Sequence, residues 1–159
     1  MKNDHLLERE TTHHVIGAFF EVYGTLGFGF LEHVYREALE MELVARGRTV
    51  QKEVFVPVRY KGVVVSRQRV DLIVDNKVVV EIKSTEALSA IAPRQLQNYI
   101  RATSFDVGLL LHFGPKPRFS RMVQSWKTRF DFSMPLLTLA AFLFRASFAL
   151  SALFRSSGS

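Results

Sequence analysis

Residues 69–83, with the sequence R-V-D-L-I-V-D-N-K-V-V-V-E-I-K, constrain the fold more than any other stretch of this chain. Two runs rich in valine flank a polar turn, Asp75-Asn76-Lys77, and this pattern is typical of a β-hairpin. A three-residue turn pairs Val74 with Val78, whereas a two-residue turn would shift the register by one residue. Because residues two apart on a strand share a face, the three-residue turn predicts one wholly apolar face, formed by Val70, Leu72, Val74, Val78, Val80 and Ile82.

Two carboxylates gather on the opposite face of this hairpin. Counting outward from the turn places Asp71 directly opposite Glu81, with Cβ atoms about 5 Å apart, and Lys83 shares the face of Glu81. Carboxylates held this close repel each other unless a proton or a cation lies between them. The pattern therefore allows a metal site with a lysine beside it. The alternative is an exposed sheet face on which Arg69, Asp71, Glu81 and Lys83 pair only as charges, and the hairpin alone favours this alternative because its pattern is short and common.

The whole chain predicts an α/β domain with the element order α-α-β-β-β-α-β-β. Helical spacing of apolar residues predicts three helices, at about 12–24, 31–46 and 92–103. Thr11 or Thr12 could cap the first helix. Alternating or continuous apolar runs predict five strands, at about 49–60, 63–74, 78–83, 107–112 and 119–123. Pro57 suggests that the first strand lies at a sheet edge or contains a bulge, and the continuous run at 107–112 suggests an interior strand.

The two ends of the chain differ from this domain. We expect a flexible N-terminus over residues 1–10, one domain over 11–124 and an apolar, helical C-terminal tail over 125–159. Residues 134–154 are nearly long enough to span a bilayer, which needs about 20 apolar residues, but Arg145 would cost about 2.5–3.5 kcal/mol there. A helix that packs on the domain or on another copy of the chain is our first interpretation. A weak membrane segment and an extension without a role are the alternatives.

Composition limits the classes of function. The net charge of +6 and the pI of about 9.9 are consistent with a polyanionic partner such as nucleic acid. We expect a solvated basic face whose phosphate contacts would be non-specific, formed by Arg94, Arg101, Lys116, Arg118 and Arg121. The absence of cysteine excludes disulfides, zinc–thiolate sites and thiol catalysis. Because the first ten residues lack the apolar segment of a signal peptide, we expect a cytoplasmic protein.

Mg²⁺ or Mn²⁺ would suit the oxygen-rich cluster on the hairpin. Asp71 and Glu81 would supply carboxylates, and the backbone carbonyl of Ile82 could supply a third oxygen because it lies between Glu81 and Lys83. Such an ion lowers the pKa of a bound water and neutralises charge on a phosphate. Lys83 could position the attacking water or stabilise the transition state. The set suits hydrolysis of phosphodiester bonds.

Two motifs carry a resemblance to a known family. Asp71…Glu81-Ile82-Lys83 resembles the signature of the PD-(D/E)XK nucleases, and the helices and strand around it match that context. Residues 27–35, G-F-G-F-L-E-H-V-Y, resemble the motif that names the GxxExxY proteins, with the named positions held by Gly29, Glu32 and Tyr35. That family is regarded as a branch of the PD-(D/E)XK superfamily. The likeness spans roughly residues 12–123.

The resemblance implies a restriction-endonuclease-like fold, a mixed central sheet flanked by helices, and a nuclease that uses Mg²⁺ or Mn²⁺. It places Asp71 and Glu81 at the metal, Lys83 in catalysis and Glu32 near the metal. Val70 stands where proline often precedes the aspartate, which is a mild departure. The alternative function is a non-catalytic module that keeps the fold and binds nucleic acid or a protein.

The third predicted helix adds a further pair. Gln95 and Tyr99 resemble the Gln-x-x-x-Tyr pattern of the RecB-like branch, in which such residues support the site or contact nucleic acid. They lie one helical turn apart and therefore on one face. Simpler interpretations also exist: Tyr35 and Tyr99 could be core residues, and Glu32 could merely complement the helix dipole.

Overall fold

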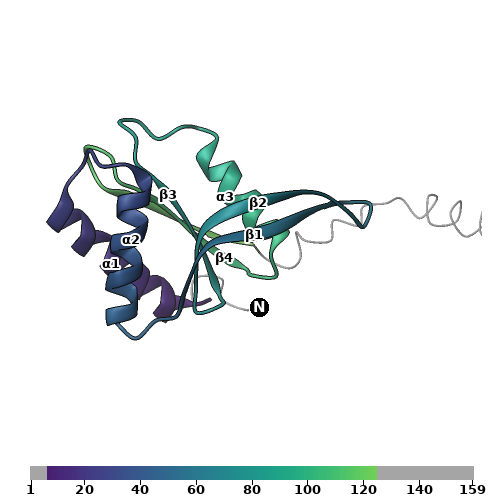
Figure 1. Ribbon diagram of the computed structural model, residues 1–159, viewed down its shortest axis with the longest axis horizontal. Helices are drawn as coiled ribbons and strands as arrows, with labels where there is room; N and C mark the ends of the chain where they lie inside the picture. Colours follow the sequence, from purple (N-terminus) through teal and green to yellow (C-terminus); the bar gives the residue numbers. More distant parts are fainter. Residues whose placement is uncertain (1–6, 125–159) are drawn as a thin grey trace, which may run out of the picture. The chain divides into compact units, whose positions relative to one another are not determined.

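The structure is a computed structural model that describes residues 7–124. Its elements follow the predicted order: α1 (Arg9–Leu26), α2 (Glu32–Ala45), β1 (Val50–Tyr60), β2 (Val63–Val74), β3 (Val78–Lys83), α3 (Ala92–Ala102), β4 (Val107–His112) and β5 (Arg118–Val123) (Figure 1). The expected tail over 125–159 and the first six residues lie outside the described residues. None of the described helices is long and apolar enough to cross a membrane.

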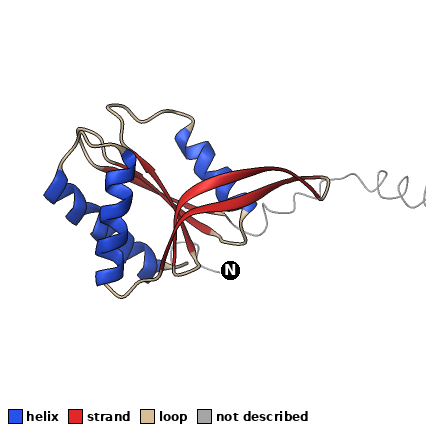
Figure 2. Ribbon diagram, in the orientation of Figure 1, coloured by secondary structure: helices blue, strands red, loops and turns tan. Residues whose placement is uncertain are grey.

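The five strands form one mixed sheet in the order β1-β2-β3-β4-β5. Strands β3 and β4 pair in parallel, and the other neighbours pair antiparallel. Helices α1 and α2 cover one face of the sheet, and α3 covers the other (Figure 2). This confirms the predicted α/β fold, with Pro57 on an edge strand and the continuous apolar strand β4 in the interior.

The start of α1 differs from the prediction. The helix begins at Arg9 after Glu8, whose backbone is left-handed (φ 48°), so neither Thr11 nor Thr12 is its N-cap. Both threonines lie inside the first turns and are buried, with their hydroxyls engaged elsewhere. The Thr12 hydroxyl donates to the Arg9 carbonyl (3.0 Å), and the Thr11 hydroxyl donates to the Asp75 carboxylate (3.1 Å).

The hairpin turn has the predicted register. Val74 pairs with Val78, and the ladder continues through Ile73 with Val79 to Leu72 with Val80. Asp75 and Asn76 adopt left-handed backbone conformations (φ 52° and 53°), which close the three-residue turn. The ladder ends at Leu72, so Asp71 and Glu81 do not form the predicted cross-strand ladder pair.

The predicted apolar face is wrong at one position. Val70 packs in the core cluster beneath α3, whereas Leu72 packs beneath α1 and α2. The alternation therefore breaks at Asp71, opposite which Glu53 of β1 is left-handed (φ 52°). The other face of the hairpin is also more apolar than predicted, because Ile73 and Val79 are buried under α3. Beyond this break, residues 54–70 continue as a two-stranded extension, the arm, which projects past α3 (Figure 1).

The Asp75 carboxylate ties two segments, α1 and the residues just before β1, to the hairpin turn. It accepts hydrogen bonds from the Thr49 backbone N–H (3.0 Å), the Thr11 hydroxyl (3.1 Å) and the Arg48 guanidinium (3.3 Å). Burial alone would raise the pKa of Asp75, but these donors hold it below its ordinary value. The ionised form therefore stabilises the folded state above the pKa of an unfolded aspartate, about 3.9, and this contribution is lost as the pH falls through the lower folded value.

We predict that Asp75→Asn lowers the free energy of unfolding by about 1 kcal/mol at pH 7, because charge-assisted hydrogen bonds become neutral ones. Asparagine tolerates the left-handed backbone, so the change isolates the charge. Urea unfolding at pH 7 and near pH 3 measures the effect, which should shrink at the acidic pH. Asp106→Asn is the control, and an equal loss at both pH values would contradict the assignment.

Candidate active site

The site lies where β2 separates from β3. At this point Asp71 Oδ2 accepts a hydrogen bond from the Ile82 backbone N–H (2.8 Å) instead of continuing the ladder. Strand β3 runs between β2 and β4, and Glu81 on it is buried, with only 3% of its surface exposed. The separation of the strands thus directs the Asp71 carboxylate toward the β3 backbone beside Glu81.

Glu81 is a buried carboxylate with one oxygen unused. Its Oε1 accepts a hydrogen bond from the Lys83 ammonium (2.7 Å). Its Oε2 is buried without a hydrogen-bond partner among the described residues. Burial and, to a smaller extent, the Asp71 carboxylate together raise the pKa of Glu81 to about 7, against the opposing effect of Lys83. The two carboxylates are therefore near enough to repel each other, as the hairpin count predicts.

Lys83 lies among three carboxylates. Burial alone would lower the pKa of its ammonium, but the contact with Glu81 and the charges of Glu32 and Asp71 raise it. The group is consequently a cation at neutral pH in this structure. It can stabilise negative charge as it stands, whereas it could accept a proton only after losing one.

Glu32 reaches the site from the first turn of α2. Its Oε1 accepts a hydrogen bond from the Ser84 backbone N–H (3.3 Å), one residue after Lys83. The Ser84 hydroxyl in turn donates to the Phe30 carbonyl (2.5 Å). These two bonds join the start of α2 to the end of β3, so Glu32 has a structural role in addition to its charge.

Tyr35 explains why the loop before α2 has its shape. Its ring is fully buried and stacks on Phe113, with centroids 4.1 Å apart. Its hydroxyl donates to the Gly27 carbonyl (2.8 Å) and accepts from the Phe30 backbone N–H (3.2 Å). Gly29 within this loop has a φ of 121°, which favours glycine. Tyr35 is thus a core residue that holds the loop and thereby positions Glu32.

Gln95 and Tyr99 approach from α3, on the other face of the sheet. Gln95 Nε2 donates to the Tyr99 hydroxyl (2.6 Å), as their spacing on the helix predicts. Burial raises the pKa of Tyr99, and the negative charges of Glu81 and Asp71 raise it further, against the Gln95 hydrogen bond and the charge of Lys83. The Tyr99 hydroxyl is therefore within electrostatic reach of the carboxylates.

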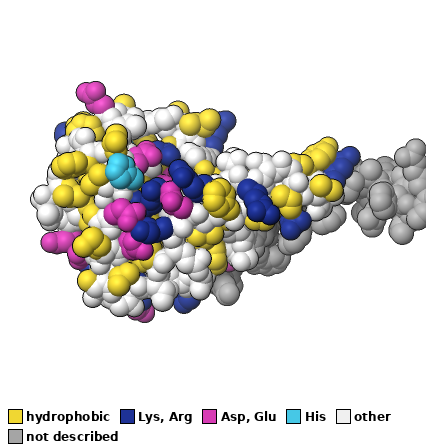
Figure 3. Space-filling view, in the orientation of Figure 1, with side chains coloured by type: hydrophobic (Ala, Val, Ile, Leu, Met, Phe, Trp, Pro, Cys, Tyr) yellow, Lys and Arg dark blue, Asp and Glu magenta, His cyan; other side chains and the backbone are white. Residues whose placement is uncertain are grey.

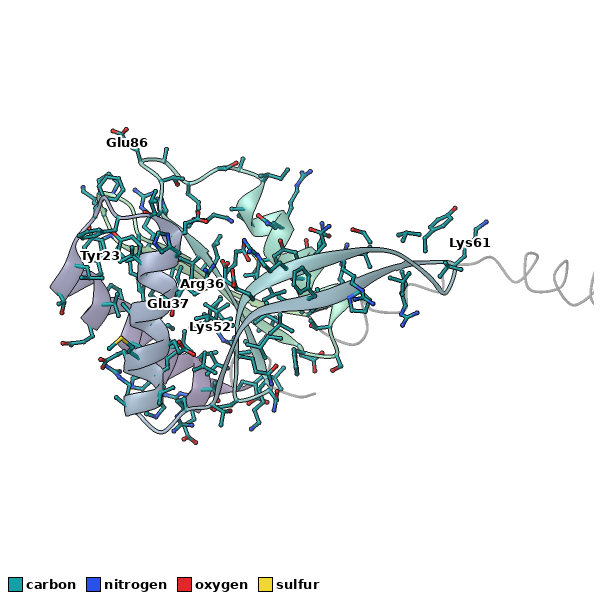
Figure 4. All side chains as sticks on the ribbon, in the orientation of Figure 1. Tyr23, Arg36, Glu37, Lys52, Lys61 and Glu86 are labelled. Atoms are coloured by element: carbon teal, nitrogen blue, oxygen red, sulfur yellow. The ribbon has the colours of Figure 1, made fainter. Side chains whose placement is uncertain are left out.

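Two residues that the sequence analysis missed, Arg36 and Glu53, form an ion-pair network beside Asp71. Arg36 on α2 places Nη1 3.6 Å from Asp71 Oδ1 and Nη2 3.1 Å from Glu53 Oε1. Arg69 also contacts Glu53 Oε1 (2.9 Å). Acidic and basic side chains accordingly alternate on the surface where α2 meets the base of the arm (Figure 3), and Arg36 extends there from α2 (Figure 4).

The sequence contains a signal that could have predicted Arg36 at the site. Arg36 follows Glu32 by four positions, which places both on one face of α2. The position of Glu53 beside Asp71 could not be predicted, because counting from the turn after Tyr60 pairs Glu53 with Val70. A register shift between Val58 and Arg59 moves Glu53 opposite Asp71 instead.

The donor set can be tested against a divalent cation. Within residues 7–124 no group of three or more His, Cys, Asp or Glu side chains is close enough together to hold a metal ion. Glu32, Asp71 and Glu81 therefore do not converge on one point. Asp71 and the unused Oε2 of Glu81 nevertheless offer hard oxygen donors, and Mg²⁺ commonly binds one or two carboxylates and keeps several waters. The pair fits such an ion, and the Ile82 carbonyl stays a predicted ligand.

Comparison with known proteins identifies the class. The family model of the PD-(D/E)XK nuclease superfamily matches residues 9–123, and the chain belongs to this superfamily. Nucleases of this superfamily generally use divalent metal ions. No curated protein gives a significant match.

Two solved structures are similar to the chain. An alkaline exonuclease, LHK-Exo, from Laribacter hongkongensis is 11% identical with a TM-score of 0.46, over 79% of this chain and 71% of that one. The structure of SSO0001 is 19% identical with a TM-score of 0.48, over 86% of this chain and 73% of that one.

We predict that Glu81→Gln stabilises the metal-free protein at pH 8 by about 2–3 kcal/mol. A carboxyl whose folded pKa is raised to about 7 destabilises the fold as the pH rises from 4.5 to 7, and glutamine resembles its protonated form. Chemical unfolding with a chelator present measures the difference, which should shrink toward pH 4.

Glu86→Gln is the matched control for this prediction, because Glu86 is exposed and extends away from the site (Figure 4). The control should leave the free energy of unfolding unchanged at every pH. A Glu81→Gln variant no more stable than the native protein at pH 8 would show that the Glu81 carboxyl is not held in an unfavourable ionised state.

Proposed function

We propose that this protein is a Mg²⁺- or Mn²⁺-dependent nuclease that hydrolyses phosphodiester bonds in nucleic acid. The observation that carries the proposal is the buried, unpartnered Oε2 of Glu81 beside the Asp71 carboxylate, with Lys83 on the same strand. A buried carboxylate with a raised pKa and a free oxygen is unfavourable for folding alone, and a bound cation would remove that disadvantage. Membership of a nuclease superfamily agrees with this interpretation.

Each residue has a distinct role in the proposal. Asp71 and Glu81 hold the cation, with the Ile82 carbonyl as a third ligand. The bound ion supplies an acidified water and charge neutralisation at the phosphate. Lys83 uses only Oε1 of Glu81, so Oε2 is available without breaking their ion pair. The Lys83 ammonium then stabilises the charge that develops on the phosphate and orients the attacking water.

The residues around this centre position it. Glu32 lies near the cation site and is fixed through Ser84 at the end of β3. The Tyr35 hydroxyl donates to the Gly27 carbonyl and holds the loop before α2. From the motif positions Gly29, Glu32 and Tyr35, we place the chain in the GxxExxY branch of the superfamily. From α3, which covers the face of the sheet that carries Glu81, Tyr99 and Gln95 support the carboxylates or contact the nucleic acid. The nuclease-like domain in this proposal covers residues 11–124.

One observation favours a second function. No three-carboxylate cluster exists within the described residues, and a guanidinium, that of Arg36, already lies 3.6 Å from Asp71. A non-catalytic module that binds nucleic acid or a protein would need no more than this. Binding that is independent of metal and unaffected by Glu81→Gln would support that alternative.

We predict that the native protein cleaves single- or double-stranded nucleic acid with Mg²⁺ or Mn²⁺ and is inactive with a chelator. Asp71→Ala and Lys83→Ala should each reduce the rate at least about 100-fold, because each removes a group that stabilises charge in the transition state. Gel-based cleavage under single-turnover conditions measures the rates.

Lys77→Ala is the matched control, since Lys77 lies in the turn of the same hairpin and its ammonium pairs with the Glu8 carboxylate (3.5 Å), away from the site. It should keep the native rate. Activity that survives both Asp71→Ala and Lys83→Ala would overturn the proposed site.

A further inference from the structure

A groove of about 840 Å³ lies between the arm and α3. One wall is formed by β1 and β2 of the arm, with Arg59 and Gln68, and the other by α3, with Arg94, Asn98 and Arg101. The last three are spaced i, i+4 and i+7, so they share one face of α3. The buried residues of α3, such as Leu96 and Ile100, face the sheet instead. Figure 1 shows α3 beside the arm.

The charges of this groove are of one sign. It is lined by three arginines, and no aspartate or glutamate contributes to its lining. Within residues 7–124 none of Arg59, Arg94 and Arg101 forms an ion pair. Arg36, Arg46, Arg48 and Arg69, by contrast, all contact carboxylates. Cations concentrated in a concave surface without counter-charges attract a polyanion.

The groove leads to the candidate active site. Its lining includes Gln95 and Tyr99, which are hydrogen-bonded to each other (2.6 Å). Both residues lie on α3, which packs on Val79 of β3, and alternation along β3 directs Glu81 to the same face of the sheet. A chain lying in the groove would therefore run past Gln95 and Tyr99 on the face that carries Glu81.

A second hollow, of about 440 Å³, adjoins the same cluster from the side of α2. Its arginines, Arg36 and Arg69, are already paired with carboxylates, those of Glu53 and Asp71. Of these two hollows, the groove between the arm and α3 is therefore the one whose arginines form no ion pair with the described residues.

We propose that this groove binds a single nucleic-acid strand and guides it to the site. Its arginines suit phosphates, its amides, Gln68 and Asn98, suit base edges, and its exposed Ile91 suits the apolar faces of bases. The volume lies in the range of small-molecule pockets, about 300–1,000 Å³.

This inference rests on the proposed function, because the guided strand is the one that would be cut. Its test measures binding with catalysis switched off by a chelator, so the two can fail separately. A native protein that binds in the groove but never cleaves refutes the nuclease and leaves the groove in place.

The test is fluorescence anisotropy with a labelled oligo(dT) of about 16 nucleotides, in EDTA and over a range of salt. Arg94→Ala/Arg101→Ala should weaken binding at least about tenfold and reduce the salt slope by about 1.4, the value for two lost contacts to a single strand. Arg59→Ala, on the opposite wall, should also weaken binding.

Arg9→Ala/Lys77→Ala is the control, because it removes two positive charges outside the groove and away from the expected basic face, and it should retain nearly native affinity. Equal losses in the control and in the α3 variant would reduce the inference to general electrostatics and overturn it. If Arg94→Ala/Arg101→Ala weakens binding but Arg59→Ala does not, the claim that both walls of the groove bind the strand would be overturned. Tighter binding of the matching duplex, or equal competition by a mononucleotide, would overturn single-strand recognition.

Discussion

The hydrogen bond from the Ile82 backbone N–H to the Asp71 carboxylate is the interaction on which the site depends. It forms because the pairing of β2 with β3, counted from the turn, ends at Leu72. The Asp71 side chain then takes the place of the next ladder hydrogen bond. The same break lets Val70 pack under α3 while Leu72 packs under the other helices. One local change thus directs a carboxylate to Glu81 and releases the arm that forms one wall of the groove.

The rest of the domain holds this break in place. Asp75 fixes the turn that sets the register, and it is bound by donors from α1 and from the segment before β1. Tyr35 and Ser84 connect the loop before α2 to the end of β3. In consequence, Glu81 is held as a buried carboxylate with a free oxygen, an arrangement that lowers stability and that, in the proposed function, a bound cation would relieve.

The sequence predicts the elements, their order, the edge strand and the hairpin register, because these follow from local periodicity and turn chemistry. It also brings Asp71, Glu81 and Lys83 together, since their proximity depends on only one short turn. It misses Glu53 and Arg36, because their positions depend on a register shift in the arm and on how α2 packs. It also predicts a ladder pair between Asp71 and Glu81, whereas the strands have already separated there. The groove could not be predicted either, since it joins an arm and a helix that are distant in sequence.

The most direct test of this account is the binding of Mn²⁺, measured by calorimetry and by electron paramagnetic resonance at neutral pH without nucleic acid. The account predicts that the native chain and Glu86→Gln bind Mn²⁺ alike. Asp71→Asn and Glu81→Gln should each weaken that binding at least about tenfold, because each removes a charged ligand. Binding that is absent in the native chain, or unchanged in both site variants, would contradict the claim that these two carboxylates form a cation site.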